Sequence, residues 1–136
     1  MALRIPPYSG QIVLCDYKGF IIPEMVKRRP VVVISPKPRR ELTLCAVVPL
    51  STTPPRVVEP HHLEVVLPPD LVHGAGFKPT CWAKCNLVNT VSLERLDLIR
   101  VGRSTGGKRQ YSYSCVNDEM LNTLRQAVVF ALTGKY

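Results

Sequence analysis

The apolar residues of this chain come in short runs that prolines and glycines interrupt, a pattern that favours a small β protein over a helical bundle. Thirteen prolines and eight glycines are spread over 136 residues. Residues 30–35 are nearly all β-branched and predict a strand buried on both faces. Further strands are expected at 11–17, 42–50, 62–67, 80–87 and 98–101, loops at 18–29, 36–41 and 68–79, and one helical turn at 92–96.

One convincing helix is expected, near the C-terminus. Asn117 is a suitable N-cap, and the acidic Asp118 and Glu119 follow in the first turn, where the helix dipole favours negative charge. Gly134 suits the end of the helix. An apolar stripe at helical spacing is expected to face the core rather than a partner: Leu121, Leu124, Val128 and Leu132.

The chain carries a large excess of positive charge, with 18 Lys and Arg against 10 Asp and Glu and a formal net charge of +8. The cations cluster at 27–29, 37–40 and 103–109, and clustered cations speed the capture of a polyanion. Composition alone does not separate RNA, DNA, an acidic protein partner and a merely solvated basic face. The length is that of one domain over 1–136, which needs neither disulfides nor a metal to fold.

The apolar runs are too short to span a bilayer and the N-terminus lacks a secretory signal, so we expect a cytoplasmic protein with no membrane partner. The five cysteines are then expected to be reduced thiols, with Cys15 and Cys45 as small hydrophobes inside strands. Cys81 and Cys85, even with three histidines elsewhere, lack the second ligand pair of a zinc site. No metal and no cofactor are expected.

Two neighbouring strands place candidate chemistry at their ends. Lys27, Arg28 and Arg29 open one strand, and Ser51 and Thr52 close the next. If the two strands are antiparallel neighbours, Arg29 and the hydroxyls meet at one rim of the sheet. A guanidinium there could bond two phosphoryl oxygens while the 2′-hydroxyl of RNA attacks the phosphorus. The plain structural alternative is that Arg29 caps carbonyls while Ser51 and Thr52 begin a turn.

Four segments in this order resemble the PemK/MazF toxins: 10–13, 27–35, 48–52, and 82–91 followed by Arg95-Leu96. The resemblance covers about residues 10 to 133. It implies a mainly β, SH3-like small barrel of the CcdB/PemK/MazF kind with a C-terminal α-helix, forming a two-fold homodimer. It also implies a sequence-selective endoribonuclease that cuts single-stranded RNA, leaves a cyclic phosphate and a 5′-hydroxyl, and is neutralised by a cognate antitoxin.

By position, the resemblance implies that Arg29 corresponds to the catalytic arginine of the family. Ser51 falls at the position of its catalytic threonine, and the neighbouring Thr52 is the alternative. Serine keeps the hydroxyl but lacks the methyl group that stiffens χ1. The Gly-x-Glu pattern common in the family reads Pro23-Glu24-Met25 here, which leaves the RNA sequence that is cut open. Candidate RNA contacts are Lys27, Arg28, Arg56, His61, His62 and Lys84.

Other interpretations stand beside these. For His61 and His62, an ordinary position on the surface is the simpler alternative to contact with RNA. Trp82 is expected in the core or a dimer seam, and stacking on a base is the alternative. Residues 102–108 match the spacing of a phosphate-binding loop, but Arg109 replaces its Ser or Thr, so a flexible basic loop touching RNA is expected. The barrel could also bind without chemistry, as a CcdB-like poison of DNA gyrase or an inactive RNA binder.

Overall fold

The computed structural model describes residues 3–36 and 43–135, and its longest strand, β3 (Leu44–Ser51), organises the sheet. The first half of β3 pairs with β6 (Asn89–Ser92), and its last two residues pair with β5 (Thr80–Lys84). On its other side β3 pairs with β2 (Arg29–Val33), which pairs with β1 (Ile12–Cys15). All of these pairings are antiparallel. The sheet edges are β4 (His62–Val66), beyond β5, and β7 (Leu96–Asp97), beyond β1.

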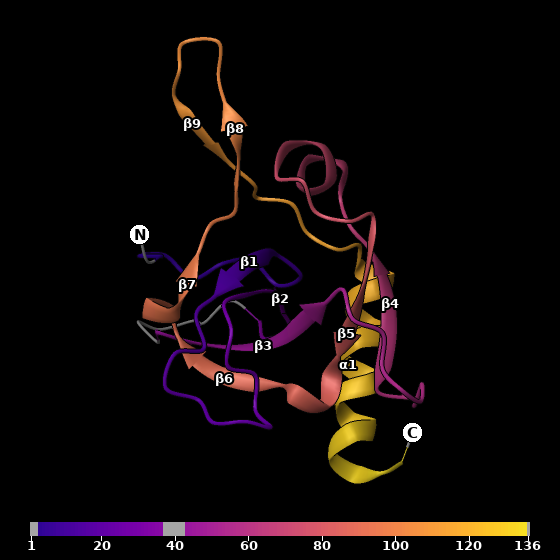
Figure 1. The fold of residues 1–136 in the computed structure, drawn as a ribbon. Coiled ribbons are helices and arrows are strands. Elements are labelled where there is room, and N and C mark those ends of the chain that lie inside the picture. Colours follow the sequence, from indigo (N-terminus) through magenta and orange to yellow (C-terminus); the bar gives the residue numbers. More distant parts are fainter. Residues whose placement is uncertain (1–2, 37–42, 136) are drawn as a thin grey trace.

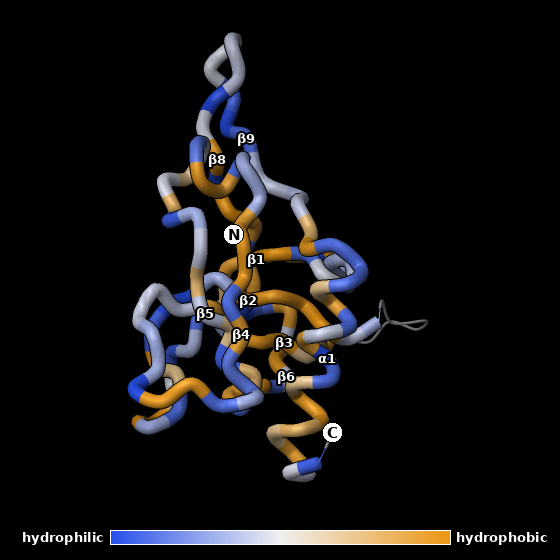
Figure 2. The backbone as a smooth tube through the Cα atoms, turned by 90° about the vertical axis from the view of Figure 1, so that its right-hand side faces the viewer, coloured by the Kyte–Doolittle hydropathy of each residue, from blue (hydrophilic) through white to orange (hydrophobic). Residues whose placement is uncertain are grey.

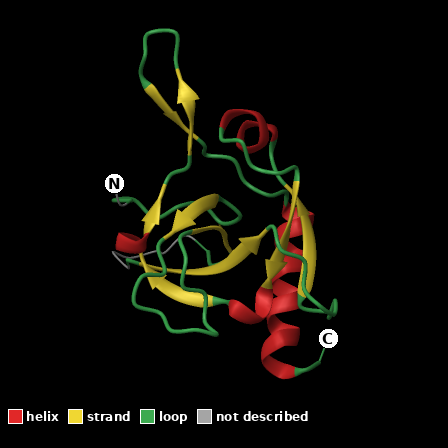
Figure 3. Cartoon of the chain, viewed as in Figure 1, coloured by secondary structure: helices red, strands yellow, loops and turns green. Residues whose placement is uncertain are grey.

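The expected mainly β fold with a C-terminal helix is confirmed (Figures 1 and 3). The order β4-β5-β3-β2-β1-β7 leaves two edges unjoined within the described residues, so the small barrel is not fully closed. The strands predicted at 11–17, 30–35, 42–50 and 62–67 are found with ends shifted by a few residues, as strand ends usually are. The turn predicted at 36–41 falls, after Pro36, outside the described residues.

Several elements differ from the expectation because they depend on distant partners. The strand expected at 98–101 is instead β8 (Arg100–Arg103), which pairs with β9 (Arg109–Tyr111) in a separate hairpin. No strand was expected at β6, which forms because β3 supplies its partner. The loop predicted at 68–79 contains a π-helical turn, η1 (Asp70–Gly74), and η2 (Cys85–Leu87) replaces the last part of the strand at 80–87. The helical turn predicted at 92–96 is found as η3 (Leu93–Arg95).

The helix α1 (Asp118–Thr133) begins and ends as its caps predict. The Asn117 side chain accepts a hydrogen bond from the Met120 amide at 2.7 Å, and Gly134 closes the helix at φ 70°. The predicted position of Leu132 in the core is wrong, because its side chain is 73% exposed. The last turns of the helix run past the sheet (Figure 1), so the stripe has nothing to pack against there.

The two faces of the sheet bury two separate apolar clusters. One face packs against α1, with Val32, Val48 and Leu50 of the sheet meeting three predicted stripe residues: Leu121, Leu124 and Val128. The other face carries Val31, Val33 and Val47 and packs against Tyr17 and Leu96. Figure 2 shows that the apolar stretches of the chain gather in the central strands. The rim beside the second cluster is where the candidate site lies.

All five cysteines are free thiols, as predicted, and four of them, including Cys15 and Cys45, are buried. Burial raises the pKa of Cys81 to about 11 and of Cys85 to about 12, so both stay protonated and unreactive at neutral pH. Within residues 3–36 and 43–135, no cluster of three or more His, Cys, Asp or Glu side chains could hold a metal ion. In the same residues, no helix has the length and apolar character needed to cross a membrane.

Candidate active site

The ends of β2 and β3 bring Arg29 and Ser51 together at one rim of the sheet. The two strands are antiparallel, with Val31 opposite Pro49. Continuing this register by two residues places Arg29 opposite Ser51, and their side chains share the face of Val31 and Pro49. Directly opposite residues have Cβ atoms about 4.5–5.5 Å apart. The register therefore places Arg29 and Ser51 at the same rim and on the same face of the sheet.

The side chain of Arg29 is partly buried and has one hydrogen-bond donor without an acceptor among the described residues. Arg29 pairs with Cys15 of β1, so the strand ladder fixes its backbone on that side. Its Nε atom is buried and has no partner in the described part of the chain. A buried donor without an acceptor costs about 1–3 kcal/mol. An anion bound at the rim would supply the missing acceptor.

Ser51 and Thr52 differ in their relation to Arg29. Ser51 is 5% exposed and lies within the strand on the same face as Arg29. Its Oγ accepts a hydrogen bond from the Thr53 amide at 3.1 Å, so Ser51 does begin a turn, but its hydroxyl proton remains free to donate. Thr52 is exposed and follows the end of the strand. The register therefore selects Ser51 as the hydroxyl beside Arg29.

Trp82 extends this arrangement across the sheet. It lies directly opposite Ser51 on β5, and Glu64 lies opposite Trp82 on β4. The four residues Arg29, Ser51, Trp82 and Glu64 thus form one cross-strand row on one face. Trp82 was expected in the core or a dimer seam, and the core position is wrong, because Trp82 is only partly buried and belongs to neither apolar cluster. The dimer seam stays a prediction. Period-two spacing assigns Trp82 and Lys84 to one face, but only the pairing with β3 shows that this face is the one of Ser51.

The two histidines hold the loop 52–61 in place. The Glu59 amide donates to Nδ1 of His62 at 3.1 Å, and Nε2 of His61 lies 3.5 Å from the Glu59 carboxylate. The two imidazole rings are in contact, with centroids 4.2 Å apart. Burial is the main cause that lowers the pKa of His62, and positive charge on His61 and Lys84 lowers it further. His62 is therefore neutral at pH 7. Both histidines contact Glu59 of their own loop, unlike the ordinary surface pair that was the simpler alternative.

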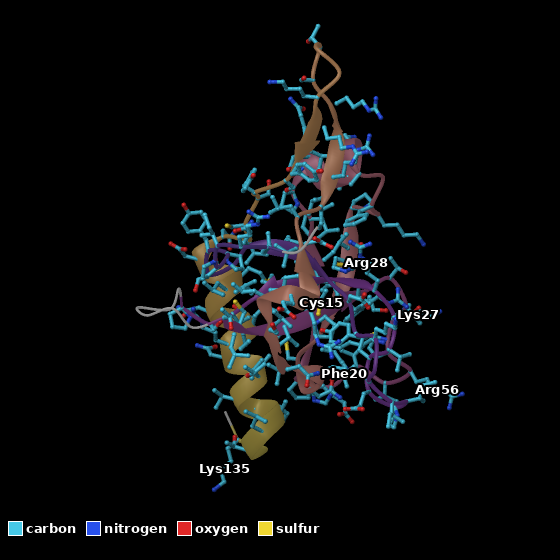
Figure 4. The ribbon with its side chains drawn as sticks, turned by 90° about the vertical axis from the view of Figure 1, so that its left-hand side faces the viewer. Cys15, Phe20, Lys27, Arg28, Arg56 and Lys135 are labelled. Atoms are coloured by element: carbon cyan, nitrogen blue, oxygen red, sulfur yellow. The ribbon has the colours of Figure 1, made fainter. Side chains whose placement is uncertain are left out.

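The predicted cations are placed around this face in different ways. Lys27 and Arg56 are exposed and project from two different loops on the side of the molecule opposite α1 (Figure 4). Lys84 is partly buried, lies opposite His62 on the neighbouring strand, and shares the face of Trp82. Arg28 points away from Arg29 and donates to the Asp97 carboxylate at 2.9 Å. Two free cations thus flank the row, while Arg28 is already paired.

Comparison with known protein families matches residues 8–129 to the model of the PemK-like, MazF-like toxin of type II toxin–antitoxin systems. The chain belongs to this family. The matched segment includes both strand ends, with Arg29 and Ser51, and most of α1. The family resemblance predicted from the sequence is thereby confirmed.

Relatives of this PemK/MazF-family chain cover nearly its whole length. The Escherichia coli (strain K12) protein YifN is 30% identical, over 98% of this chain and 97% of the relative. A mycobacterial endoribonuclease, solved in complex with its cognate antitoxin, is 20% identical with a TM-score of 0.61, over 96% and 99% of the two chains. MazF from Deinococcus radiodurans is 17% identical with a TM-score of 0.61, over 98% and 100%. At these identities the likeness to the two solved structures concerns the fold alone.

The Gly102–Lys108 spacing does not form a nucleotide-binding loop in this PemK/MazF-family chain. The segment forms the end of β8 and the turn of the β8–β9 hairpin, and the chain enters β9 directly after Lys108. A phosphate-binding loop needs a helix N-terminus at this point. A flexible basic loop was expected here, and the segment instead belongs to a hydrogen-bonded hairpin.

Proposed function

We propose that this PemK/MazF-family protein is a sequence-selective endoribonuclease that cleaves single-stranded RNA without a metal or organic cofactor. The observation that carries the proposal is the buried, unpartnered Nε of Arg29 on the face of Ser51, beside exposed cations. RNA brings its own nucleophile, so a site that cleaves it needs to neutralise charge and orient the phosphate rather than provide an attacking group. Family membership supports the same activity.

The chemistry that this site would support is an in-line transfer at phosphorus. The O2′–P bond forms as the P–O5′ bond breaks; one proton leaves the 2′-oxygen and one joins the 5′-oxygen. The products are a 2′,3′-cyclic phosphate and a 5′-hydroxyl. Arg29 would donate from its guanidinium to two phosphoryl oxygens as negative charge develops on them, and Ser51 would donate its hydroxyl proton to the same group.

Neighbouring residues would hold the RNA around this phosphate. Lys27 and Arg56 would contact flanking phosphates from the two loops, because both are exposed on the side of the rim. Trp82 is partly exposed beside Ser51, where its ring could stack on a base. Lys84 would add a further cation on the Trp82 face. His61 and His62 would act indirectly, by fixing the loop that carries Arg56.

The test is cleavage of RNA in the presence of EDTA. A long RNA serves to map the cleaved sequence, and a synthetic oligonucleotide with that sequence is then cut in EDTA. We expect undiminished cleavage and a cyclic phosphate at the new 3′ end. The same oligonucleotide with a single 2′-deoxy substitution at the cleaved nucleotide should resist the enzyme. Cleavage of the substituted strand, or loss of activity in EDTA, would contradict the proposal.

A matched pair of hydroxyl deletions tests the assignment of Ser51. Ser51→Ala should lower kcat by about tenfold or more, because it removes a donor to the phosphate. Thr52→Ala should leave kcat within about threefold, because Thr52 lies beyond the strand and is exposed. Thermal unfolding of both variants provides the control for folding. A larger loss of kcat for Thr52→Ala would reverse the assignment.

We further propose that the protein acts in the cytoplasm as a homodimeric toxin that inhibits growth until a cognate antitoxin binds it. Membership of a toxin–antitoxin family supports this. The exposed cations near Arg29 suit an acidic antitoxin segment that would cover the rim. Adding the cognate partner at equimolar concentration should suppress RNA cleavage, and a partner that binds without suppressing cleavage would contradict coverage of the rim.

A further inference from the structure

The β8–β9 hairpin is a basic arm that projects from the body of the molecule (Figures 1 and 2). It carries four cations, Arg100, Arg103, Lys108 and Arg109, and all four are exposed. The segment from residue 98 to residue 117 contains no Asp or Glu. None of the four cations forms an ion pair with a carboxylate among the described residues. The arm is therefore not neutralised by its own protein.

The register of the hairpin gathers three arginines and a tyrosine on one face. Arg103 lies opposite Arg109, and Arg100 lies opposite Tyr111. Arg109 and Tyr111 are two residues apart on β9 and share a face. Arg100 and Arg103 are three apart, which would normally place them on opposite faces, but a bulge between Arg100 and Gly102 shifts the register. We call this set of Arg100, Arg103, Arg109 and Tyr111 the arginine face.

The arginine face is electrostatically unfavourable in the protein alone. Like charges directly opposite each other on paired strands destabilise the pairing, and Arg103 and Arg109 are such a pair. A bound polyanion would convert this repulsion into attraction. Tyr111, which is 39% exposed, adds an aromatic surface beside the cations. Cations interleaved with an aromatic ring are typical of single-stranded nucleic acid binding.

The hairpin is held in a defined orientation. Its turn is closed by a hydrogen bond from the Ser104 amide to the Lys108 carbonyl at 2.7 Å, and its base by one from the Ser112 amide to the Ile99 carbonyl at 2.8 Å. Gly74 of η1 packs so closely on Val101 that an added Cβ would lie 2.6 Å from the Val101 carbonyl oxygen. A preorganised arm loses less entropy on binding than a flexible loop.

A groove extends from the arginine face along β1 and β7 to Arg28. It has a volume of about 480 Å³, and Arg100 and Tyr111 line it together with Arg4, Arg28, Leu14 and Asp97. Three arginines thus face one carboxylate there. Arg28 directly precedes Arg29 in the chain, but its side chain points toward Asp97, so the groove reaches the start of β2 on the sheet face opposite to that of Arg29. RNA passing over the rim could continue along it toward the hairpin.

We propose that the arginine face and this groove bind the sugar–phosphate backbone of the substrate RNA outside the cleaved linkage. The proposal rests on the proposed function, because it assumes that RNA occupies the rim at Arg29. The hairpin then contributes to affinity for long RNA and leaves the chemical step unchanged. An acidic peptide is the alternative ligand for such a surface, and Tyr111 beside the arginines favours a nucleic acid.

The test compares two variants of equal net charge. Arg103→Gln with Arg109→Gln removes the facing pair, and Lys78→Gln with Lys135→Gln removes two exposed cations elsewhere, with Lys135 at the opposite end of the molecule (Figure 4). Each variant lowers the net charge from +8 to +6. The probes are two RNAs with a 2′-deoxy nucleotide at the cleaved position: one limited to the cleavage site and its nearest neighbours, and one extended at both ends. Binding is measured over a range of salt concentrations, and cleavage with the unsubstituted RNAs.

We expect the wild type and the lysine variant to bind the extended RNA about tenfold more tightly than the short one, and the arginine variant to lose most of this gain. The slope of log affinity against log salt should fall by about 1.4 in the arginine variant, since each phosphate contact contributes about 0.7 for a single strand. kcat on the short RNA should be the same for all three proteins.

The proposal would be overturned if both variants lost equal affinity for the extended RNA. It would also be overturned if the arginine variant kept the full gain in affinity that extension of the RNA gives. Extended RNA that binds no more tightly than short RNA to the wild type would overturn it as well. If the wild type cleaves no RNA, the proposed function fails, and the two variants are then compared in the binding of a long single-stranded RNA, where a loss confined to the arginine variant still supports the hairpin and equal losses overturn it. If the wild type cleaves RNA but the arginine variant binds normally, only the hairpin proposal fails.

Discussion

Replacing Arg29 by alanine should lower kcat for RNA cleavage by about 100- to 1000-fold, which corresponds to about 2.7–4 kcal/mol of transition-state stabilisation. The reason is that the guanidinium would bind the phosphoryl oxygens most strongly when their charge is greatest. Single-turnover cleavage with saturating enzyme measures this step directly. Arg29→Lys should recover only part of the rate, because an ammonium group keeps the charge but cannot form the planar pair of hydrogen bonds.

The same substitution should not destabilise the fold. The Nε donor of Arg29 is buried without a partner, and its removal relieves a cost of about 1–3 kcal/mol that offsets the lost packing of the side-chain stem. We therefore expect Arg29→Ala to unfold at the same urea concentration as the wild type or a higher one. Strong destabilisation would mean that Arg29 has a structural role, and wild-type cleavage by the variant would remove Arg29 from the site.

Arg28→Ala is the informative comparison for Arg29, because it deletes the neighbouring guanidinium. Arg28 forms an ion pair with Asp97 in which its own side chain is 55% exposed, and exposed pairs contribute only about 0–1 kcal/mol to stability. Its loss should raise KM for long RNA and leave kcat within about threefold of the wild-type value. A similar collapse of kcat in both variants would show that net charge, rather than the placement of one guanidinium, controls cleavage.

Replacing Leu124 by alanine should cost about 2–5 kcal/mol of folding free energy. The Leu124 side chain is fully buried between α1 and the sheet, in the cluster that contains Val48 and Leu50, so truncation leaves a cavity in the centre of the core. Domains of this size are commonly stable by only about 5–15 kcal/mol. Urea unfolding followed by circular dichroism should show a large drop in the midpoint with an unchanged slope.

Leu132→Ala on the same helix is the matched control. The chemical change is identical, but the Leu132 side chain is 73% exposed at the end of α1 beyond the sheet. Its effect on the free energy of unfolding should lie within about 0.5 kcal/mol. Equal effects for the two variants would mean that the end of the helix is covered in solution, for example by a second copy of the chain.

Strand β2 serves both the fold and the proposed chemistry, through different residues. Val31 and Val33 of β2 are fully or almost fully buried and stabilise the second apolar cluster, whereas Arg29 at the start of the same strand keeps an unsatisfied donor. Pairing with β1 fixes the backbone of this residue without help from its side chain. A rigid sheet rim is therefore well suited to hold a guanidinium in position before an anion binds.

Some features of this protein were determined by the sequence alone because they depend on neighbours in the chain. The limits of α1 follow from Asn117 and Gly134, which satisfy backbone groups within a few residues. The β-branched run after Arg29 favours a strand wherever it is placed. The meeting of Arg29 with Ser51 required one assumption, that consecutive strands pair, and this is the commonest arrangement of adjacent strands in sheets.

Tertiary structure decided the features that depend on which distant strands become neighbours. Alternation along a strand shows that Trp82 shares a face with Lys84, but only the pairing of β5 with β3 aligns that face with Ser51. A bulge between Arg100 and Gly102 brings Arg100 to the face of Arg103, although the two residues lie three apart in the chain. Leu132 continues the helical stripe, yet the sheet ends before it. In each case local periodicity sets the direction of a side chain, while its surroundings are set by packing between segments far apart in the sequence.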